Sequence, residues 1–96
     1  MKDKLLKKIE NKEAHLVVVG MGYVGLPLAV EFTRAGFKVT GLEVDQEKVD
    51  LLNSGKSYIP DISSDRLAPL VAQGSLSATT DADILTMADA VSISVP

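Results

Sequence analysis

The stretch that decides the fold of this chain reads Val17-Val18-Val19-Gly20-Met21-Gly22-Tyr23-Val24-Gly25. Inside regular structure a glycine costs roughly 0.5–1 kcal/mol relative to alanine, because it loses more backbone freedom when the chain folds. Here three glycines stand within six residues, directly after a run of β-branched residues. This spacing indicates a backbone that turns tightly and lets another molecule approach closely.

Strands and helices are predicted to alternate around this stretch. The apolar run from Leu16 to Val19 is typical of a strand covered on both faces. The apolar spacing from Tyr23 to Ala35 predicts a helix, with Pro27 near its start and Gly36 ending it.

Further helices are expected from Asp45 to Leu52, from Asp65 to Gln73 and from Asp81 to Met87. Asp45 is the expected N-cap of the first, and Ser63 or Ser64 caps the second, which Gly74 ends. Further strands are expected over 37–44, 75–79 and 90–95. Because strands alternate with helices, we predict an α/β fold with a parallel sheet and right-handed crossovers.

Composition narrows the class of protein. A chain of 96 residues makes one small domain, and a net charge of −3 argues against a nucleic-acid partner. The chain contains no cysteine, which excludes disulfides, thiolate metal sites and cysteine nucleophiles within it. His15 is the single histidine and has no ligand cluster around it, so we expect no metal site. It precedes the first predicted strand, and we expect it to be a surface residue rather than a catalyst.

Residues 1–14 form a separate segment, which we expect to be an amphipathic helix with a solvated face. Five lysines surround its apolar residues Leu5, Leu6 and Ile9. The segment has no apolar core typical of a signal peptide, and the chain has no run long enough to span a membrane. The expectation is therefore a cytoplasmic protein without membrane partners.

The three glycines form the pattern Gly20-x-Gly22-x-x-Gly25, placed after a predicted strand and before a predicted helix. In this context the pattern is typical of dinucleotide binding. The first glycine allows a tight turn, the second lets a pyrophosphate approach the backbone, and the third lets helix and strand pack closely. The amides of Tyr23 and Val24 would then face the phosphates, aided by the helix dipole. The alternative is a strand-to-helix turn that binds no ligand.

Glu43 is the second element of this hypothesis. It stands at the end of the second predicted strand, 23 residues after Gly20, close to the spacing of about 20 expected for the acid that binds the adenosine ribose. A carboxylate there accepts hydrogen bonds from ribose hydroxyls and repels a 2′-phosphate, so NAD is favoured over NADP. The alternative is an ordinary solvated carboxylate at a strand end.

Beyond these elements, the chain resembles the N-terminal end of the UDP-glucose/GDP-mannose dehydrogenase family, the nucleotide-sugar 6-dehydrogenases, from about Leu5 to Pro96. The resemblance rests on four stretches: Gly20-Met21-Gly22-Tyr23-Val24-Gly25-Leu26-Pro27-Leu28-Ala29, Val39-Thr40-Gly41-Leu42-Glu43-Val44-Asp45, Lys56-Ser57-Tyr58-Ile59-Pro60-Asp61 and Ile93-Ser94-Val95-Pro96. The lysine-rich start and the third stretch look most like the branch that acts on UDP-N-acetylhexosamines.

This resemblance implies a partial Rossmann-like, three-layer α/β/α fold with about four parallel strands in the order 3-2-1-4, preceded by the N-terminal helix. It implies NAD as cofactor and oxidation of the C6 alcohol of a UDP-sugar to a carboxylate. Residues 15–96 would be the first part of the NAD-binding domain, truncated after the fourth strand.

The resemblance also implies cofactor contacts. Tyr23 and Val24 would contact the diphosphate, and Glu43 stands where the family usually has an aspartate on the adenosine ribose. Lys48 matches a basic position that reaches the adenosine end, although a solvated helix lysine is as good an interpretation. Val95 and Pro96 match the start of a loop that borders the cofactor.

The family oxidises through a cysteine, assisted by a lysine and an aspartate, that lie in later parts of its sequence. We therefore expect no catalytic residue within these 96 residues and no activity of the chain alone. Two alternatives stay open, the FAD-binding start of a flavoprotein and a non-catalytic dinucleotide-binding half-domain. The apolar edge from Ala90 to Val95 also predicts self-association into a homo-oligomer.

Overall fold

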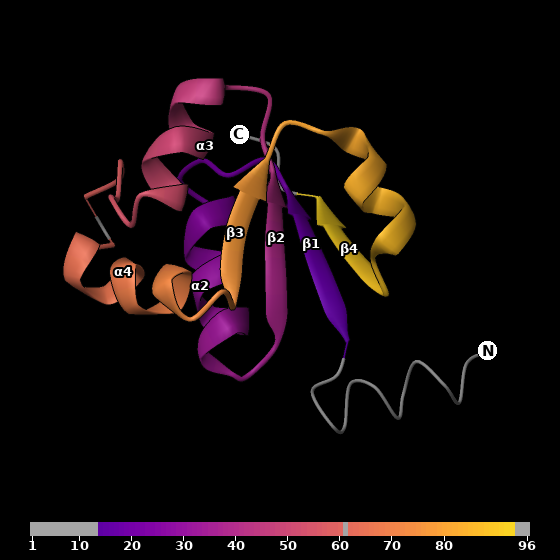
Figure 1. The fold of residues 1–96 in the computed structure, drawn as a ribbon, viewed down its shortest axis with the longest axis horizontal. Helices are drawn as coiled ribbons and strands as arrows, with labels where there is room; N and C mark the ends of the chain where they lie inside the picture. The colour runs from indigo at the N-terminus through magenta and orange to yellow at the C-terminus, as the bar shows by residue number, and fades with distance from the viewer. Residues whose placement is uncertain (1–13, 61, 94–96) are drawn as a thin grey trace.

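The computed structural model describes residues 14–60 and 62–93. Its centre is a parallel sheet of four strands in the order β3-β2-β1-β4 (Figure 1). The strands are β1 (His15–Val19), β2 (Lys38–Leu42), β3 (Leu76–Thr79) and β4 (Ala90–Ile93). The α/β class, the parallel pairing and the predicted order 3-2-1-4 are confirmed.

The helices are α2 (Gly25–Arg34), α3 (Gln46–Asn53), α4 (Ser64–Ala72) and η1 (Ala82–Met87). The first three were predicted with ends within two residues of those observed, whereas η1 is a 3₁₀-helix. The predicted caps are present: Asp45 Oδ1 accepts from the amide of Glu47 at 3.0 Å, and Ser63 Oγ from that of Arg66 at 3.3 Å. Gly36 has φ 107°, a left-handed conformation that suits the glycine predicted to end α2.

The sheet has one face covered by helices and one covered by η1. Figure 1 shows α2, α3 and α4 on the same side of the sheet, with η1 near β4 on the other side. The strand register places Leu16, Val39 and Leu76 side by side on the helix-covered face, where all three are buried. These three side chains share one hydrophobic core with Leu26, Ala29 and Val30 of α2.

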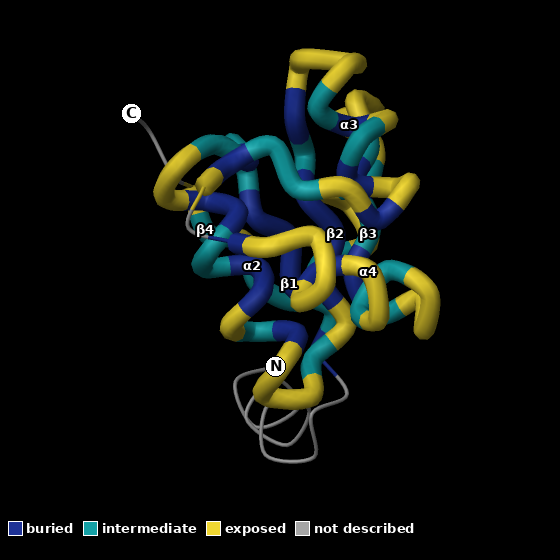
Figure 2. The backbone as a smooth tube through the Cα atoms, turned by 90° about the vertical axis from the view of Figure 1, so that its left-hand side faces the viewer, coloured by how far each residue is buried: buried dark blue, intermediate teal, exposed yellow. Residues whose placement is uncertain are grey.

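Strand β1 is buried on both faces, as predicted, since Val17 and Val18 are each 0% exposed. Figure 2 shows the buried residues concentrated through the sheet and along α2. Strand β4 lies at the edge of the sheet, where Val91 is 47% and Ile93 72% exposed. Self-association through this edge stays a prediction, to be decided by the mass of the protein in solution.

Several sequence predictions lie outside the described residues: all but Ala14 of the N-terminal helix predicted over 1–14, the last residues of the fourth strand, and the cofactor contacts of Val95 and Pro96. Ala14 itself is not helical. Among the helices that the structure describes, none combines the length and apolar character needed to cross a membrane.

Candidate dinucleotide-binding site

The chain leaves β1 through a tight turn at Gly20. This residue has φ 88°, a conformation that residues with a side chain rarely adopt. Its amide donates to the carbonyl of Leu42 at 2.9 Å, so the turn remains attached to the end of β2. The loop that follows therefore starts at the carboxyl edge of the sheet, between two adjacent strands.

Three backbone amides after this turn have no hydrogen-bond partner among the residues that the structure describes. Within residues 14–60 and 62–93, the amides of Gly22, Tyr23 and Val24 donate to no acceptor. The N-cap of α2 is Val24, which supplies no side-chain hydrogen bond, and the first turn of α2 contains no acidic residue. Tyr23 is 73% and Val24 61% exposed. The start of α2 thus presents free N–H groups to solvent, together with the positive end of the helix dipole.

The backbone at Gly22 borders open space on the side where a side chain would project. A Cβ built on Gly22 would meet no atom within 4 Å, so this glycine faces open space. Gly25, the third glycine of the pattern, is buried as the first residue of α2. The arrangement can accept an anionic group that approaches the backbone at Gly22.

Glu43 lies beside the glycine loop. Its Oε1 accepts from the amide of Met21 at 3.1 Å, and its Oε2 accepts from the amide of Asp45 at 2.9 Å. Glu43 is 9% exposed, so it is not the solvated carboxylate of the alternative interpretation. These bonds hold a negative charge within hydrogen-bond distance of the turn between β1 and α2.

Met21 is a structural residue of the site that the sequence pattern did not reveal. Its side chain is 0% exposed and lies against Gly41 of β2. A Cβ on Gly41 would come within 2.5 Å of Met21 Cγ. The absence of a side chain at Gly41 makes room for Met21, which anchors the loop in the core.

Tyr58 is a second residue that sequence reasoning did not select as a site residue. Its hydroxyl donates to the carbonyl of Met21, from the loop between α3 and α4. Burial, followed by the charges of Glu43 and Asp45, raises the pKa of Tyr58 to about 12, so the hydroxyl keeps its proton at neutral pH. The one sequence feature that could have indicated Tyr58 is its place in Lys56-Ser57-Tyr58-Ile59-Pro60-Asp61, one of the four stretches that resemble the dehydrogenase family.

Lys48 lies near Tyr58 rather than beside the glycine loop. Its Nζ lies 5.9 Å from the centroid of the Tyr58 ring, a cation–π distance. The structure therefore brings together Gly20, Gly22, Tyr23, Val24, Gly25, Glu43 and Lys48 around the ends of β1 and β2.

The prediction that His15 precedes the first strand is wrong. His15 is the first residue of β1 and is partly buried, with Nε2 2.8 Å from the hydroxyl oxygen of Thr40 on the neighbouring strand. Burial and then the Lys38 charge lower its pKa, against the opposing effect of Asp89. It lines an open groove of about 460 Å³ beneath η1.

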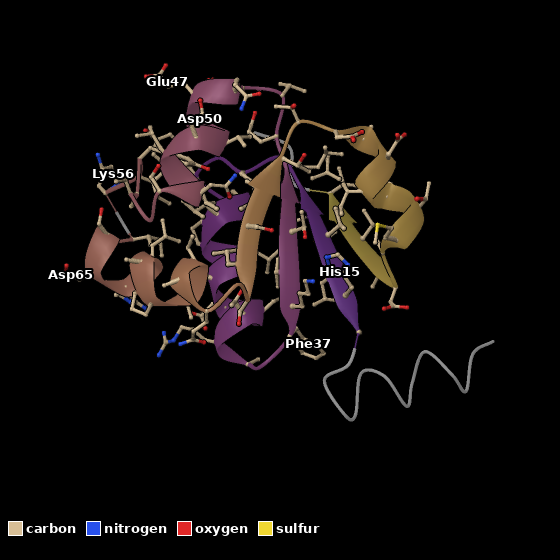
Figure 3. The ribbon with its side chains drawn as sticks, in the orientation of Figure 1. His15, Phe37, Glu47, Asp50, Lys56 and Asp65 are labelled. Carbon is tan, nitrogen blue, oxygen red and sulfur yellow. The ribbon has the colours of Figure 1, made fainter. Side chains whose placement is uncertain are left out.

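Figure 3 shows His15 on β1, and the residues that line the groove include none of the glycine loop. The described part of the chain contains no group of three or more His, Cys, Asp or Glu side chains that could hold a metal ion.

Residues 14–96 match the sequence profile of the UDP-glucose/GDP-mannose dehydrogenase family, NAD binding domain. The chain belongs to this family. The match confirms the resemblance seen in the sequence motifs, and it favours NAD over the FAD of the flavoprotein alternative.

Relatives with known names support the same assignment. UDP-N-acetyl-D-mannosamine dehydrogenase of Campylobacter jejuni is 39% identical over 87 residues, covering 90% of this chain and 21% of the relative. The solved structure of NDP-N-acetyl-D-galactosaminuronic acid dehydrogenase from Methanosarcina mazei Go1 is 30% identical in sequence and has a TM-score of 0.79. The match covers 97% of this chain and 22% of the chain of that enzyme. GDP-mannose dehydrogenase from Pseudomonas aeruginosa, solved as a ternary complex, is 34% identical with a TM-score of 0.77, over 84% of this chain and 19% of its own.

The chain thus spans about a fifth of the length of these relatives. Its described fold is the Rossmann-like start of nucleotide-sugar dehydrogenases, and the UDP-N-acetylhexosamine branch is represented among its named relatives.

Proposed function

We propose that this chain supplies NAD-binding residues to a nucleotide-sugar dehydrogenase that oxidises the C6 hydroxyl of a UDP-sugar to a carboxylate. The observation that carries the proposal is the pair formed by the free amides at the start of α2 and the Glu43 carboxylate beside them. One group can bind phosphate and the other can bind a ribose, and both lie at the carboxyl edge of adjacent strands, where such folds bind dinucleotides.

The phosphate part of the proposal concerns the glycine loop. The amides of Gly22, Tyr23 and Val24 would donate to the cofactor diphosphate, with Gly20 setting the turn and Gly25 the close packing of α2. An anion at this position is favoured by the positive end of the helix dipole. No acidic residue stands in the first turn of α2 to offset that field.

The ribose part concerns Glu43. A carboxylate has about four acceptor positions, and two bonds from Met21 and Asp45 leave others for ribose hydroxyls. Its charge would repel a 2′-phosphate, which favours NAD over NADP. Lys48 would lie towards the adenosine end, and Val95 and Pro96 would border the cofactor.

NAD, when bound, accepts the hydride taken from the substrate carbon. The residues of this chain would bind and orient the cofactor rather than attack the sugar, since no cysteine stands among the 96 residues. A UDP-N-acetylhexosamine is the proposed substrate class of a full-length parent, because relatives named UDP-N-acetyl-D-mannosamine dehydrogenase match most of this chain. We place the protein in the cytoplasm, where nucleotide-sugar substrates would reach it.

Calorimetric titration of the chain with NADH, NADPH and FAD tests this function. We expect NADH to bind best and NADPH to bind at least tenfold more weakly. The Glu43→Gln variant should lose about tenfold in NADH affinity, equivalent to about 1.4 kcal/mol, and discriminate less against NADPH.

The matched control is Glu31→Gln, which neutralises an exposed carboxylate on α2 whose ion-pair partner is Arg34 at 3.5 Å. Exposed pairs contribute little, so this variant should bind NADH like the wild type. Tighter binding of FAD than of NADH, or equal losses in both glutamate variants, would overturn the proposed site.

A further inference from the structure

The loop between α3 and α4 reaches back to the glycine loop. Tyr58, in the middle of this connection, donates its hydroxyl hydrogen to the carbonyl of Met21, 37 residues earlier in the chain. The ring of Tyr58 packs against the hydrophobic core that contains Met21, so the ring is held in place as well as the hydroxyl. A segment outside the glycine motif therefore contacts the motif directly.

Two successive peptide groups of the glycine loop are held by side chains. The amide of Met21, in the peptide group shared with Gly20, donates to Glu43 Oε1. The carbonyl of Met21, in the peptide group shared with Gly22, accepts from Tyr58. The side chain of Met21, which lies between these two peptide groups, is 0% exposed. Rotation of either peptide group would break a hydrogen bond that the protein now makes.

The second of these bonds determines where an amide points. A peptide group is planar and trans, so its C=O and N–H point in opposite directions. The Met21 carbonyl and the Gly22 amide belong to the same group. When Tyr58 holds that carbonyl on one side, the Gly22 N–H points to the opposite side.

We propose that Tyr58 is a positioning residue for the dinucleotide-binding loop: its hydroxyl orients the Met21–Gly22 peptide group so that the Gly22 amide faces the cofactor diphosphate. The inference rests on the proposed function and deepens it, since it assigns the α3–α4 loop a part in cofactor affinity. Preorganised donors bind an anion without the cost of ordering them at the moment of binding.

The Tyr58→Phe variant tests this inference, because it removes the hydroxyl and keeps the ring that packs on the core and faces Lys48. We expect the affinity for NADH and for ADP-ribose to fall about tenfold. In the ligand-free protein, the ¹⁵N–¹H resonance of the Gly22 amide should shift, a change that a residue supporting only the fold would not cause selectively.

The matched control is Ser54→Ala, which removes another hydroxyl that donates to a backbone carbonyl, that of Asp50 at 2.8 Å, at the end of α3. This variant should bind NADH like the wild type and leave the Gly22 resonance unchanged. Equal NADH affinity in Tyr58→Phe and wild type would overturn the role of Tyr58 while the proposed function stands.

Failure of the wild type itself to bind NADH would refute the proposed function, and the ligand-free Gly22 resonance would still decide whether Tyr58 orients the loop. Should Tyr58→Phe not fold, slow solvent exchange of the Tyr58 hydroxyl proton in the wild type provides the second measurement. A hydroxyl that exchanges as fast as that of a free tyrosine would overturn the inference.

Discussion

Helices α2 and α3 follow adjacent parallel strands, yet their first turns are built in opposite ways. The start of α3 is capped by a side chain: Asp45 Oδ1 accepts from the amide of Glu47 at 3.0 Å. Glu47 adds a second acidic group to the first turn. The start of α2 has Val24 at the N-cap, no side-chain cap and no acidic residue. The start of α3 has a side-chain acceptor for one of its amides, whereas the amides of Gly22, Tyr23 and Val24, which lead into α2, donate to no acceptor among the described residues.

The remaining helices follow the pattern of α3. In α4, Ser63 Oγ accepts from the amide of Arg66, and in η1, Asp81 Oδ1 accepts from the amide of Asp83. Among the helices that the structure describes, α2 alone starts without a side-chain cap. Since a cap stabilises a helix by about 1 kcal/mol, α2 begins without a contribution that the other described helices have.

Packing explains how α2 remains stable with an open start. Its side chains Leu26, Ala29 and Val30 are each 0% exposed against the sheet. Full burial of a leucine or valine side chain contributes about 1.5–3 kcal/mol, more than a cap does. The buried residues of α3 are only Val49 and Leu52. The comparison teaches that α2 is held by its buried face, so its first turn is available for a ligand.

The largest effect is expected when the start of α2 is made acidic, like that of α3. In the Val24→Asp variant, a carboxylate at the helix start should lower NADH affinity on the order of 100-fold. Two charges about 6 Å apart at an effective dielectric constant of about 20 repel by roughly 3 kcal/mol. The same carboxylate favours the helix dipole by about 0.3–1 kcal/mol, so the ligand-free protein should be no less stable. Fluorescence titration with NADH and urea denaturation measure the two effects.

The neutral variant Val24→Asn separates charge from shape. It presents a side chain of nearly the same size as aspartate without the negative charge, and we expect it to lose less than tenfold in affinity. If it lost as much as Val24→Asp, the exposed valine itself would be the binding group, and the free amides would not explain affinity.

Sequence alone could predict the parts of this site that depend on near neighbours. The glycine turn, the start of α2, the cap at Asp45 and the end of α2 at Gly36 each follow from the conformational preferences of a few consecutive residues. The position of Glu43 was also predictable, because the length of one strand–helix–strand unit sets its distance from the first glycine.

The contacts that depend on the packing of distant segments were not predictable. Met21 is buried because Gly41, on the next strand, has no side chain. Tyr58 reaches Met21 from a loop whose path depends on how α3 and α4 pack on the sheet. His15 is partly buried because β2 places Thr40 beside it. The periodicity of the sequence cannot predict these contacts, because each joins residues at least 20 positions apart.

Removing the cap of α3 is a milder test of the same comparison. The Asp45→Ala variant should lower the free energy of unfolding by about 1 kcal/mol, because the amide of Glu47 loses its acceptor. NADH affinity should stay within about twofold of the wild type, since the bond to Glu43 comes from the backbone amide of residue 45, which alanine retains. Urea denaturation and NADH titration of the same samples check both expectations.

Asp45→Asn is the control, because asparagine is as good an N-cap as aspartate and lacks its charge. We expect it to keep the stability of the wild type. A loss of NADH affinity of more than tenfold in Asp45→Ala, without unfolding, would make the Asp45 side chain part of the cofactor site. The first turns of α2 and α3 would then both serve the ligand, and the division between an open helix start and a closed one would have to be abandoned.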